Sequence, residues 1–259
     1  MDKFSSGVVP IQKGDKFNLM QYLKNELERE QMRNIPYISV VGSLMYAQTC
    51  TRLDKSFAVG ILGRYQSNPW LDHWKAAKKF FKYLQGTKDH MLTYRRFDHL
   101  KVIGYSYSDF AGCVGTRKST FGYLFLLAGG AISWKSAKQS VIVASMMKAE
   151  FVACFEATIH GSWLQNFILG LRIVDSIAKL LKIYYDNSTV VFFSKNDKYS
   201  KGAKHIEIKY LAVKEEVQKH TVSIEYISTN LMIANPMTKE LPPKIFNEHV
   251  ERMGILGNM

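Results

Sequence analysis

Hydrophobic positions follow two different periods along this chain, and the change falls near Leu100. Between residues 36 and 97 apolar residues recur every three or four positions, which indicates helices that pack by one face. The stretch SNPWLDHWKAAKKFFKYLQG is the clearest predicted helix, with Asn68 as its candidate N-cap and Gly86 as its stop. Its predicted apolar stripe consists of Trp74, Ala77, Phe81 and Leu84.

After Leu100 the pattern changes to short strands and then alternates with helices. LKVIGYSYSD, TFGYLFLLAGG and GAISWKS each predict a strand, and short turns join them. A helix capped by Ser145, the strand LKIYYD, a helix from Asn187, an amphipathic helix over 205–219, the strand VSIEYIST and a helix over 232–239 follow. Strands joined by turns pair antiparallel, and strands reached through helices add in parallel. We therefore predict an α/β fold, a mixed five-stranded sheet flanked by helices and preceded by a small, mainly helical segment.

Composition divides the chain into four predicted parts. Residues 1–35 are polar and form a tail or linker, residues 36–98 form the mainly helical segment, and residues 99–240 form the sheet-containing domain. Residues 241–259 carry Pro242-Pro243 and a final helical piece, and are predicted to be a C-terminal tail.

Charge adds a candidate partner to this picture. The 259 residues carry a net charge of +13, and a globular chain this basic is typical of proteins that face nucleic acid. Lysines form a stripe on the predicted helix over 68–86, and two more basic residues precede the second strand. The candidate nucleic-acid-binding residues are Lys75, Lys78, Lys79, Lys82, Arg117 and Lys118. The alternative is a solvated lysine-rich surface without a ligand.

Cysteine use and apolar runs favour an intracellular setting. The three cysteines are widely spaced and form no CxxC pair, which argues against a disulfide framework and against a structural zinc site. The N-terminus lacks the apolar core of a secretory signal, and no run approaches the ~18 apolar residues of a membrane span. We expect a cytoplasmic or nuclear protein that is not secreted and has no membrane partner.

Several segments, in a fixed order, carry a resemblance to a known family. They are VGSLMYAQTCTRLD, HWKAAKKFFKYLQGT, GYSYSDFAG, RKSTFGYLFLLAGGAISWKSAKQS, KAEFVACFEA, YYDNST, KHIEIKY and IANPMTKELPP. This series resembles the C-terminal part of the Pol polyprotein of copia-type LTR retrotransposons, which comprises the end of the reverse transcriptase followed by RNase H. The resemblance implies that residues 36–98 are a reverse-transcriptase remnant, that residues 99–240 are an RNase H-like domain, and that the rest of a Pol polyprotein is a partner.

The resemblance also implies a chemistry and its residues. Family members hydrolyse the RNA strand of RNA–DNA hybrids with two Mg²⁺ ions about 4 Å apart, held by four carboxylates. The second and third of these positions are Glu150 and Asp186, which the chain retains. The first falls on Tyr107 and the fourth on Asn235, and Lys148 stands where the family usually has a glutamate.

These departures predict an impaired site. Glu150 and Asp186 supply about −2 charge where four carboxylates would supply about −4, and a tyrosine phenol is neutral near pH 7. Asp109 is a third candidate metal ligand, but it lies about 6.6 Å along the strand from position 107. We therefore expect RNase H-type hydrolysis to be weakened together with Mg²⁺ binding. The alternatives are a catalytically inactive nucleic-acid-binding relic of a degenerate transposon copy, or a copy without selected function.

Each site residue also has a structural interpretation when it is taken alone. Asp109 would be a turn aspartate, Glu150 a first-turn helix acid, and Asp186 with Asn187 a helix start. His205 is better explained as a helix-start residue than as a base or ligand. Cys154 suits packing better than nucleophilic chemistry, because no histidine motif accompanies it. Trp134 either stacks on nucleic acid or packs in the core.

Overall fold

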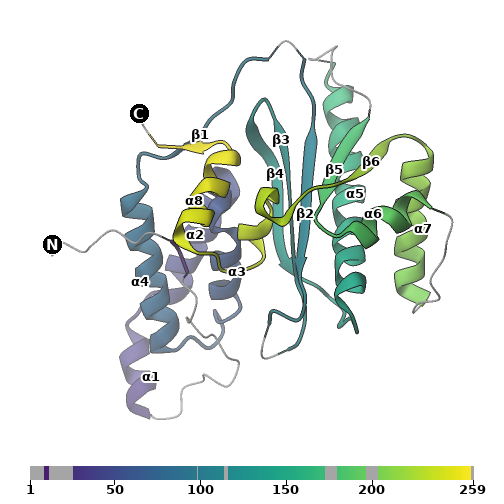
Figure 1. The fold of residues 1–259 in the computed structure, drawn as a ribbon. Coiled ribbons are helices and arrows are strands. Elements are labelled where there is room, and N and C mark those ends of the chain that lie inside the picture. Colours follow the sequence, from purple (N-terminus) through teal and green to yellow (C-terminus); the bar gives the residue numbers. More distant parts are fainter. Residues whose placement is uncertain are drawn as a thin grey trace.

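The computed structural model describes residues 9–11, 26–97, 99–113, 116–172, 180–196 and 204–257, except the side chains of 26–29 and 204–206. A sheet stands at the centre, with helices α5, α6 and α7 on one side and helices α1 to α4 and α8 on the other (Figure 1). This arrangement confirms the predicted α/β fold and its preceding helical segment.

The main sheet has five strands in the order β4-β3-β2-β5-β6. Strands β2 (Ile103–Asp109), β3 (Thr120–Leu127) and β4 (Gly130–Lys138) pair antiparallel. Strands β5 (Leu181–Tyr185) and β6 (Val222–Tyr226) add in parallel beside β2. The mixed five-stranded sheet and all five of its predicted strands are therefore confirmed.

One face of the sheet is covered by α5 (Met146–Gly170), α6 (Ser188–Lys195) and α7 (Lys204–Gln218). Their apolar side chains meet those of the strands in one buried core, in which Phe125, Ile183 and Ile224 are fully buried. The predicted caps of α5 and α6 are confirmed, because Ser145 accepts from the Lys148 amide and Asn187 caps α6. No helix in the described part of the chain, the 25-residue α5 included, is long and apolar enough to cross a membrane.

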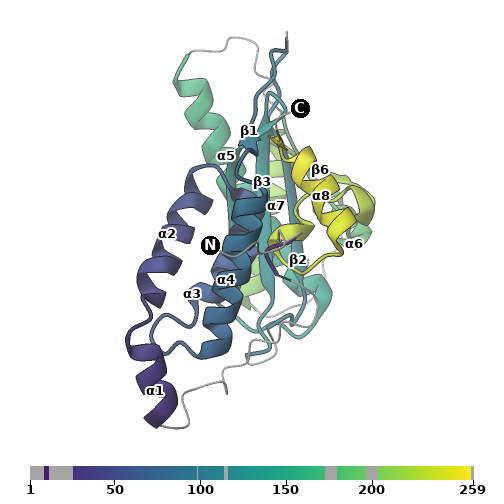
Figure 2. The ribbon, with the colours of Figure 1, turned by 90° about the vertical axis from the view of Figure 1, so that its left-hand side faces the viewer.

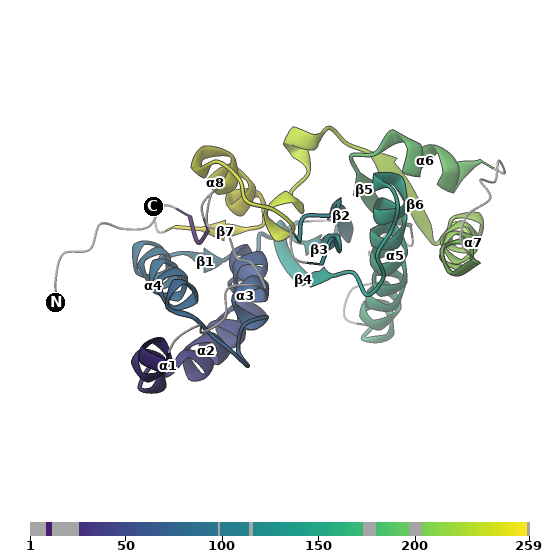
Figure 3. The same ribbon diagram turned by 90° about the horizontal axis from the view of Figure 1, so that it is seen from below.

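The opposite face carries the segment after β6, which crosses β2 and β3 on its way to α8 (Pro243–Arg252) (Figure 3). Here the chain forms two short 3₁₀ turns, η2 (Thr229–Leu231) and η3 (Asn235–Met237), so the helix predicted over 232–239 is wrong. A buried core joins η3 and α8 to the sheet. Gly122 permits this approach, because a Cβ there would lie 2.7 Å from Cβ of Met237. Gly122 pairs with Tyr107, so the approach brings η3 next to Tyr107.

The helical segment contains α2 (Tyr37–Cys50), η1 (Leu53–Lys55), α3 (Ser56–Gly63) and α4 (Leu71–Gly86). A short helix, α1 (Glu26–Arg33), precedes it in the part predicted as a tail. Figure 2 shows α2 and α4 in front of the sheet. The segment has its own buried core around Val41, Leu62 and Phe80. The short strand β1 (Met91–Leu92) follows α4 and pairs with β7 (Ile255–Leu256) near the C-terminus.

Two details of α4 differ from the prediction. The helix begins at Leu71 with Trp70 as its N-cap, two residues later than the predicted cap Asn68, although it ends at Gly86 as predicted. Its buried face consists of His73, Ala76, Ala77, Phe80 and Tyr83. Phe81, predicted to be in the stripe, is 41% exposed. The segment contains many apolar and aromatic positions, so spacing alone allowed a stripe turned by one residue.

Candidate active site

Side chains from four separate segments of the chain meet at the end of β2. Burial alternates along this strand, so Ser106 and Ser108 face α5 whereas Tyr105 and Tyr107 face the η3 side. The negative charges of Asp186, Glu150 and Asp109 all act on Tyr107. We call Tyr107, Asp109, Glu150, Asp186, Asn235 and Lys239 the strand-end cluster. The structure thus brings together the positions that the sequence predicted.

Glu150 enters the cluster from the first turns of α5. The Ser108 backbone N–H donates to its Oε1 at 3.2 Å, which ties α5 to β2. Its Oε2 is buried and has no protein partner. Burial, reinforced by the charge of Asp186, raises the pKa of Glu150 well above its ordinary value. This carboxyl therefore resists ionisation where a metal ligand has to be charged.

Asp186 and Asn235 are linked through Thr229. The Thr229 hydroxyl donates to Asp186 Oδ2 at 2.9 Å, and the Asn235 amide donates to the Thr229 carbonyl at 3.0 Å. Asn235 is 3% exposed, and its Oδ1 has no protein partner. Burial raises the pKa of Asp186, against the opposing effects of Thr229 and Lys239. The fourth position thus offers a buried amide oxygen without charge.

Tyr107 is paired with a lysine from the chain just after η3. Lys239 Nζ donates to the Tyr107 hydroxyl at 2.7 Å and lies 4.2 Å from the centre of its ring. Burial, together with the negative charges around it, raises the pKa of Tyr107, so the phenol stays neutral. A neutral ring, hydrogen-bonded to a lysine, therefore stands at the position where the resemblance predicts the first carboxylate.

Asp109, the third candidate metal ligand, lies at the end of the same strand. It is the last residue of β2, two positions beyond Tyr107, and its carboxylate lies so close to Gly112 that no Cβ would fit there. Burial raises its pKa, while Lys239 acts in the opposite direction. Its side chain packs against the turn that follows its own strand.

The donor set does not fit two Mg²⁺ ions. Among the described residues, no group of three or more histidine, cysteine, aspartate or glutamate side chains is arranged to hold a metal ion. Mg²⁺ demands near-octahedral oxygen ligands at about 2.0–2.1 Å, and charged ligands hold it best. At two of the ligand positions that the resemblance predicts, the chain has a phenol and an amide, and the charges of Asp109, Asp186 and Glu150 act on the nearby Lys239.

Known proteins with similar sequences include Pol polyproteins of plant transposons. The chain is 38% identical over 233 residues to the retrovirus-related Pol polyprotein from transposon TNT 1-94 of Nicotiana tabacum, a match that covers 89% of this chain and 17% of that polyprotein. It is 32% identical over 220 residues to the Pol polyprotein from transposon RE2 of Arabidopsis thaliana, covering 85% and 15%. The chain belongs to the retrovirus-related Pol polyproteins of transposons. It spans less than a fifth of the length of these two relatives.

Half of this Pol segment also resembles a separate protein. The chain is 44% identical over 133 residues to secreted RxLR effector protein 161 of Plasmopara viticola, which covers 51% of this chain and 94% of that protein. No protein-family model matches the chain. The compartment of this Pol segment stays a prediction, since one relative is named as a secreted protein.

Solved structures with a similar fold include RNase H proteins. LC11-RNase H1 in complex with an RNA/DNA hybrid shares 16% identity with a TM-score of 0.40, over 53% of this chain and 93% of that one. The foamy viral protease-reverse transcriptase in complex with dsDNA shares 11% identity with a TM-score of 0.47, over 79% and 42%. The RNase H-like assignment of this Pol segment rests on its own strand order and its sequence relatives.

The predicted basic positions fall on two surfaces of the Pol segment. Lys75, Lys78, Lys79 and Lys82 lie on the outer side of α4, where they line a pocket of about 500 Å³ together with Phe81 and Gln85. Arg117 and Lys118 lie in the turn between β2 and β3, which directly follows the strand-end cluster. Arg117 is exposed there with a positive φ of 50°. Whether these surfaces bind nucleic acid stays a prediction.

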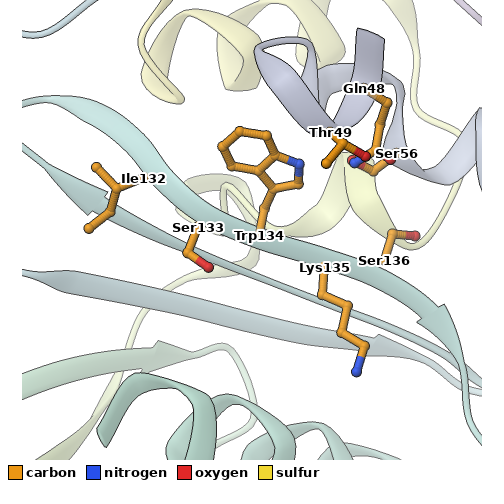
Figure 4. A pocket seen from close by; sticks show the side chains of 8 residues that line it. All are labelled: Gln48, Thr49, Ser56, Ile132, Ser133, Trp134, Lys135 and Ser136. Carbon is orange, nitrogen blue, oxygen red and sulfur yellow. The ribbon is translucent and has the colours of Figure 1, made fainter. Parts of the chain in front are cut away.

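Trp134 packs at the edge of the core, and its stacking on nucleic acid stays a prediction. Its ring packs against the core on the η3 side and also lines a pocket of about 360 Å³ beside α2. Figure 4 shows the ring directed toward Gln48 and Thr49, whereas Lys135 points away from them. Cys154 is fully buried, and burial raises the pKa of its thiol to about 12, which agrees with packing. The side chain of His205 lies outside the described residues.

Sequence reasoning missed Lys239 and Thr229 as members of the site. Lys239 belongs to the matched stretch IANPMTKELPP, and Thr229 follows the strand VSIEYIS. The spacing of four between Asn235 and Lys239 was the available signal, because a turn at Asn235 brings both residues to one place. A lysine at such a spacing is ordinarily a solvent-exposed helix residue, so it gave only a weak signal that Lys239 belongs to the site.

Proposed function

We propose that this chain carries the RNase H-type domain of a transposon Pol polyprotein, that it binds RNA–DNA hybrids, and that hydrolysis of the RNA strand is impaired in this copy. The observation that carries the proposal is the composition of the strand-end cluster. Its positions converge as in a metal-dependent hydrolase, yet Tyr107 and Asn235 contribute no charge. Lys239 lies at the same place, where burial lowers the pKa of its ammonium against the opposing effect of the nearby carboxylates.

The charges of the strand-end cluster explain why hydrolysis would be slower. In two-metal catalysis the protein's task is to hold the ions in fixed geometry. Here burial disfavours the ionised form of Glu150, and Asp186 is left as the better-hydrated carboxylate of the pair. A site with this donor set binds divalent ions weakly, so the residues that remain can position a nucleic-acid strand better than they can cleave it.

Hybrid binding would use the basic surfaces. Four lysines of α4 surround a pocket that also exposes the ring of Phe81, and this combination suits a phosphate backbone with an adjacent base. Arg117 and Lys118 would contact phosphates close to the strand-end cluster. The remainder of the Pol polyprotein, with its reverse transcriptase, would deliver the hybrid in a cytoplasmic or nuclear setting.

A binding measurement tests this part of the proposal. Fluorescence anisotropy with a labelled RNA–DNA hybrid should show binding whose logarithmic affinity falls linearly with the logarithm of salt concentration. Replacing Lys75, Lys78, Lys79 and Lys82 by alanine should reduce that slope by about one unit per lost phosphate contact. The double variant Arg117→Ala/Lys118→Ala should reduce it by about two units.

The matched control removes lysines elsewhere. Lys182→Ala/Lys219→Ala lowers the net charge by the same amount as the Arg117/Lys118 variant, and Lys219 is already paired with Glu215. Its slope should equal that of the unaltered chain. If the control and a basic-surface variant lost the same amount of slope, the effect would be one of net charge and not of these surfaces. If the chain bound no hybrid even at low salt, the proposal that it binds hybrids would be refuted.

A second candidate function is an inactive nucleic-acid-binding relic. The pairing of Lys239 with Tyr107 favours it, because a phenol hydrogen-bonded to a lysine takes up the place of a charged metal ligand. The two candidates differ in one outcome: the impaired nuclease retains slow, Mg²⁺-dependent cleavage of the hybrid, whereas the relic binds the hybrid and leaves it intact.

A further inference from the structure

A pocket of about 360 Å³ lies between α2, α3 and strand β4, and it shares no residue with the strand-end cluster. We call it the β4 pocket. Its lining consists of Gln48 and Thr49 of α2, Ser56 of α3 and residues 132–136 of β4. In the five-stranded sheet β4 is an outermost strand, so the pocket lies at an edge of the sheet. Its volume is in the range of pockets that hold small organic ligands.

The Trp134 ring forms one wall of the β4 pocket. It is only partly buried, and it packs on the core that joins η3 and α8 to the sheet. The ring is directed toward Gln48 and Thr49 (Figure 4). Two residues further along β4, the Ser136 hydroxyl donates to the Met237 carbonyl at 2.6 Å, which ties the strand to η3. An aromatic ring that is supported by the core and exposed to a pocket can stack on a flat ligand.

Most polar groups of the β4 pocket are already engaged, and a few remain open to a ligand. All four hydroxyl groups that line it are hydrogen-bonded within the chain. The Gln48 side-chain amide donates to the Ser56 hydroxyl at 3.0 Å, which uses one of its two N–H groups and fixes its direction. Among the described residues, no hydrogen-bond partner is present for its Oε1, its second N–H or the Trp134 indole N–H. A ligand would therefore meet one aromatic face, two donors and one acceptor.

The charge of the β4 pocket favours a neutral ligand group that is carried by an anion. None of the eight lining residues is acidic, and Lys135 is the one basic residue among them. Its side chain points away from Gln48 and Thr49, so the space in front of the Trp134 ring is uncharged (Figure 4). The net charge of +13 attracts anions to the chain as a whole. A nucleobase combines these properties, because it is flat and neutral, carries donors and acceptors on its edge, and is attached to a phosphate backbone.

We propose that the β4 pocket binds one unpaired nucleobase of a nucleic-acid strand, stacked on Trp134 and hydrogen-bonded to Gln48. Every base has a π face, so the pocket would accept all four bases and hold purines best because of their larger rings. A base inside a duplex is stacked between its neighbours and would have to be extruded first. The proposal goes beyond the proposed function, because it concerns a single-stranded segment and neither the hybrid nor its hydrolysis.

Fluorescence anisotropy with a labelled single-stranded oligoadenylate tests the proposal. In Trp134→Ala the affinity should fall about 5- to 150-fold, the range for loss of one base–aromatic stack. The slope of logarithmic affinity against logarithmic salt concentration should stay unchanged, because no phosphate contact is lost. Gln48→Leu removes the amide and leaves Trp134 in place, and it should weaken binding about 2- to 10-fold. A blunt RNA–DNA hybrid should bind equally well to the unaltered chain and to both variants.

Trp163→Ala is the matched control. Trp163 is 58% exposed and stacks on Phe167 with ring centres 5.5 Å apart, but it lies on α5 and outside the β4 pocket. Its loss should leave the affinity for the oligoadenylate unchanged. Should Trp134→Ala fold too poorly to measure, Trp134→Phe keeps a ring and should retain most of the affinity, and Gln48→Leu still reports on the pocket.

Adenosine monophosphate distinguishes two sources of the base. The mononucleotide should bind more weakly than the oligoadenylate, because the neighbouring phosphates of a strand add contacts with the basic chain. Equal affinities would assign the pocket to a free nucleotide and overturn the strand as its ligand. Unchanged affinity for the oligoadenylate in folded Trp134→Ala and Gln48→Leu, or a loss as large in Trp163→Ala, would overturn the β4 pocket as a base-binding site.

Failure of the β4 pocket and failure of the proposed function are distinguishable. A chain that binds the blunt hybrid but shows no loss of oligoadenylate binding in Trp134→Ala would refute the β4 pocket alone. A chain that binds the oligoadenylate through Trp134 and does not bind the blunt hybrid would refute hybrid binding alone.

Discussion

Two buried clusters of charge in this molecule are built in opposite ways. In the helical segment, Asp54 receives two hydrogen bonds from Arg52, at 3.1 and 2.9 Å, and a third from the Tyr83 hydroxyl at 2.7 Å. Arg52 also donates to Thr87. We call Arg52, Asp54, Lys55, Tyr83 and Thr87 the helical-segment cluster. Both oxygens of its carboxylate are satisfied.

The strand-end cluster leaves its acceptors incomplete. Glu150 Oε2 and Asn235 Oδ1 are buried without protein partners, and burial raises the pKa of Glu150, Asp186 and Asp109 together. Buried polar groups in a purely structural network are ordinarily paired. The carboxylate of the helical-segment cluster is thus fully hydrogen-bonded, whereas the acceptors of the strand-end cluster remain open to a ligand.

The largest expected loss of stability comes from a substitution that breaks the helical-segment cluster. Asp54→Asn leaves the charge of Arg52, which is 7% exposed, without its carboxylate. Loss of one partner of a buried ion pair costs about 3–5 kcal/mol. Urea unfolding should show a fall of that size in the free energy of unfolding. Asp72→Asn is the control, because the exposed Asp72–Lys75 pair contributes less than about 0.5 kcal/mol. Equal losses in the two variants would remove the distinction.

A smaller change in stability is expected when Lys55 of the same cluster is replaced. Lys55 is fully buried, its Nζ has no hydrogen-bond partner, and burial lowers its pKa from 10.5 to about 7. The unfolded chain therefore binds more protons between pH 7 and 10.5, so this lysine destabilises the fold most below pH 7 and progressively less above it. Lys55→Met should stabilise the chain at pH 6.5, and its advantage should shrink by about 2 kcal/mol at pH 9.

Urea unfolding at the two pH values measures that difference. Lys182→Met provides the baseline, since Lys182 is exposed on β5 and its replacement should give the same small change at both. A Lys55→Met advantage that is constant with pH would show that the lysine is charged in the folded chain throughout this range.

The smallest expected change in the free energy of unfolding concerns Glu150 in the strand-end cluster. Its dependence on pH is opposite to that of Lys55. The pKa of Glu150 lies well above its ordinary 4.5 in the folded chain, so the unfolded chain releases this proton first. Stability therefore falls as pH rises from about 4.5 toward the folded pKa. Glu150→Gln should remove this fall and be more stable than the unaltered chain at pH 8, as measured by urea unfolding.

The control for Glu150 is an exposed glutamate with the opposite shift. Lys219 lowers the pKa of Glu215, so Glu215→Gln should bring no gain at pH 8. A Glu150→Gln variant that is less stable than the unaltered chain at pH 8 would mean that the ionised carboxylate supports the fold, and the contrast between the two clusters would disappear.

The sheet and the positions of the candidate site could be predicted from the sequence because both depend on local signals. Strand order follows from turn and crossover connections, and Glu150 and Asp186 stand at element ends that local signals mark, the Ser145 cap and the strand LKIYYD. Tyr107 and Asn235 were located by the family motifs around them. These features depend on residues close together in sequence.

The features that could not be predicted depend on tertiary contacts. The segment after β6 forms 3₁₀ turns because η3 is held against Gly122 and Ser136, which lie more than 100 residues earlier in the chain. The contact of Lys239 with Tyr107 joins residues 132 positions apart. The buried face of α4 is set by its neighbours in the helical segment, and no local spacing reports them.

The most direct measurement compares cleavage of an RNA–DNA hybrid by two forms of this chain in Mg²⁺. We predict little or no cleavage by the unaltered chain and substantial cleavage by Tyr107→Asp/Asn235→Asp, which restores both carboxylates and frees Lys239. Adding Glu150→Gln to the double variant should abolish that activity, which excludes a contaminating nuclease. Robust Mg²⁺-dependent cleavage by the unaltered chain, at a rate equal to that of the double variant, would contradict the impaired site.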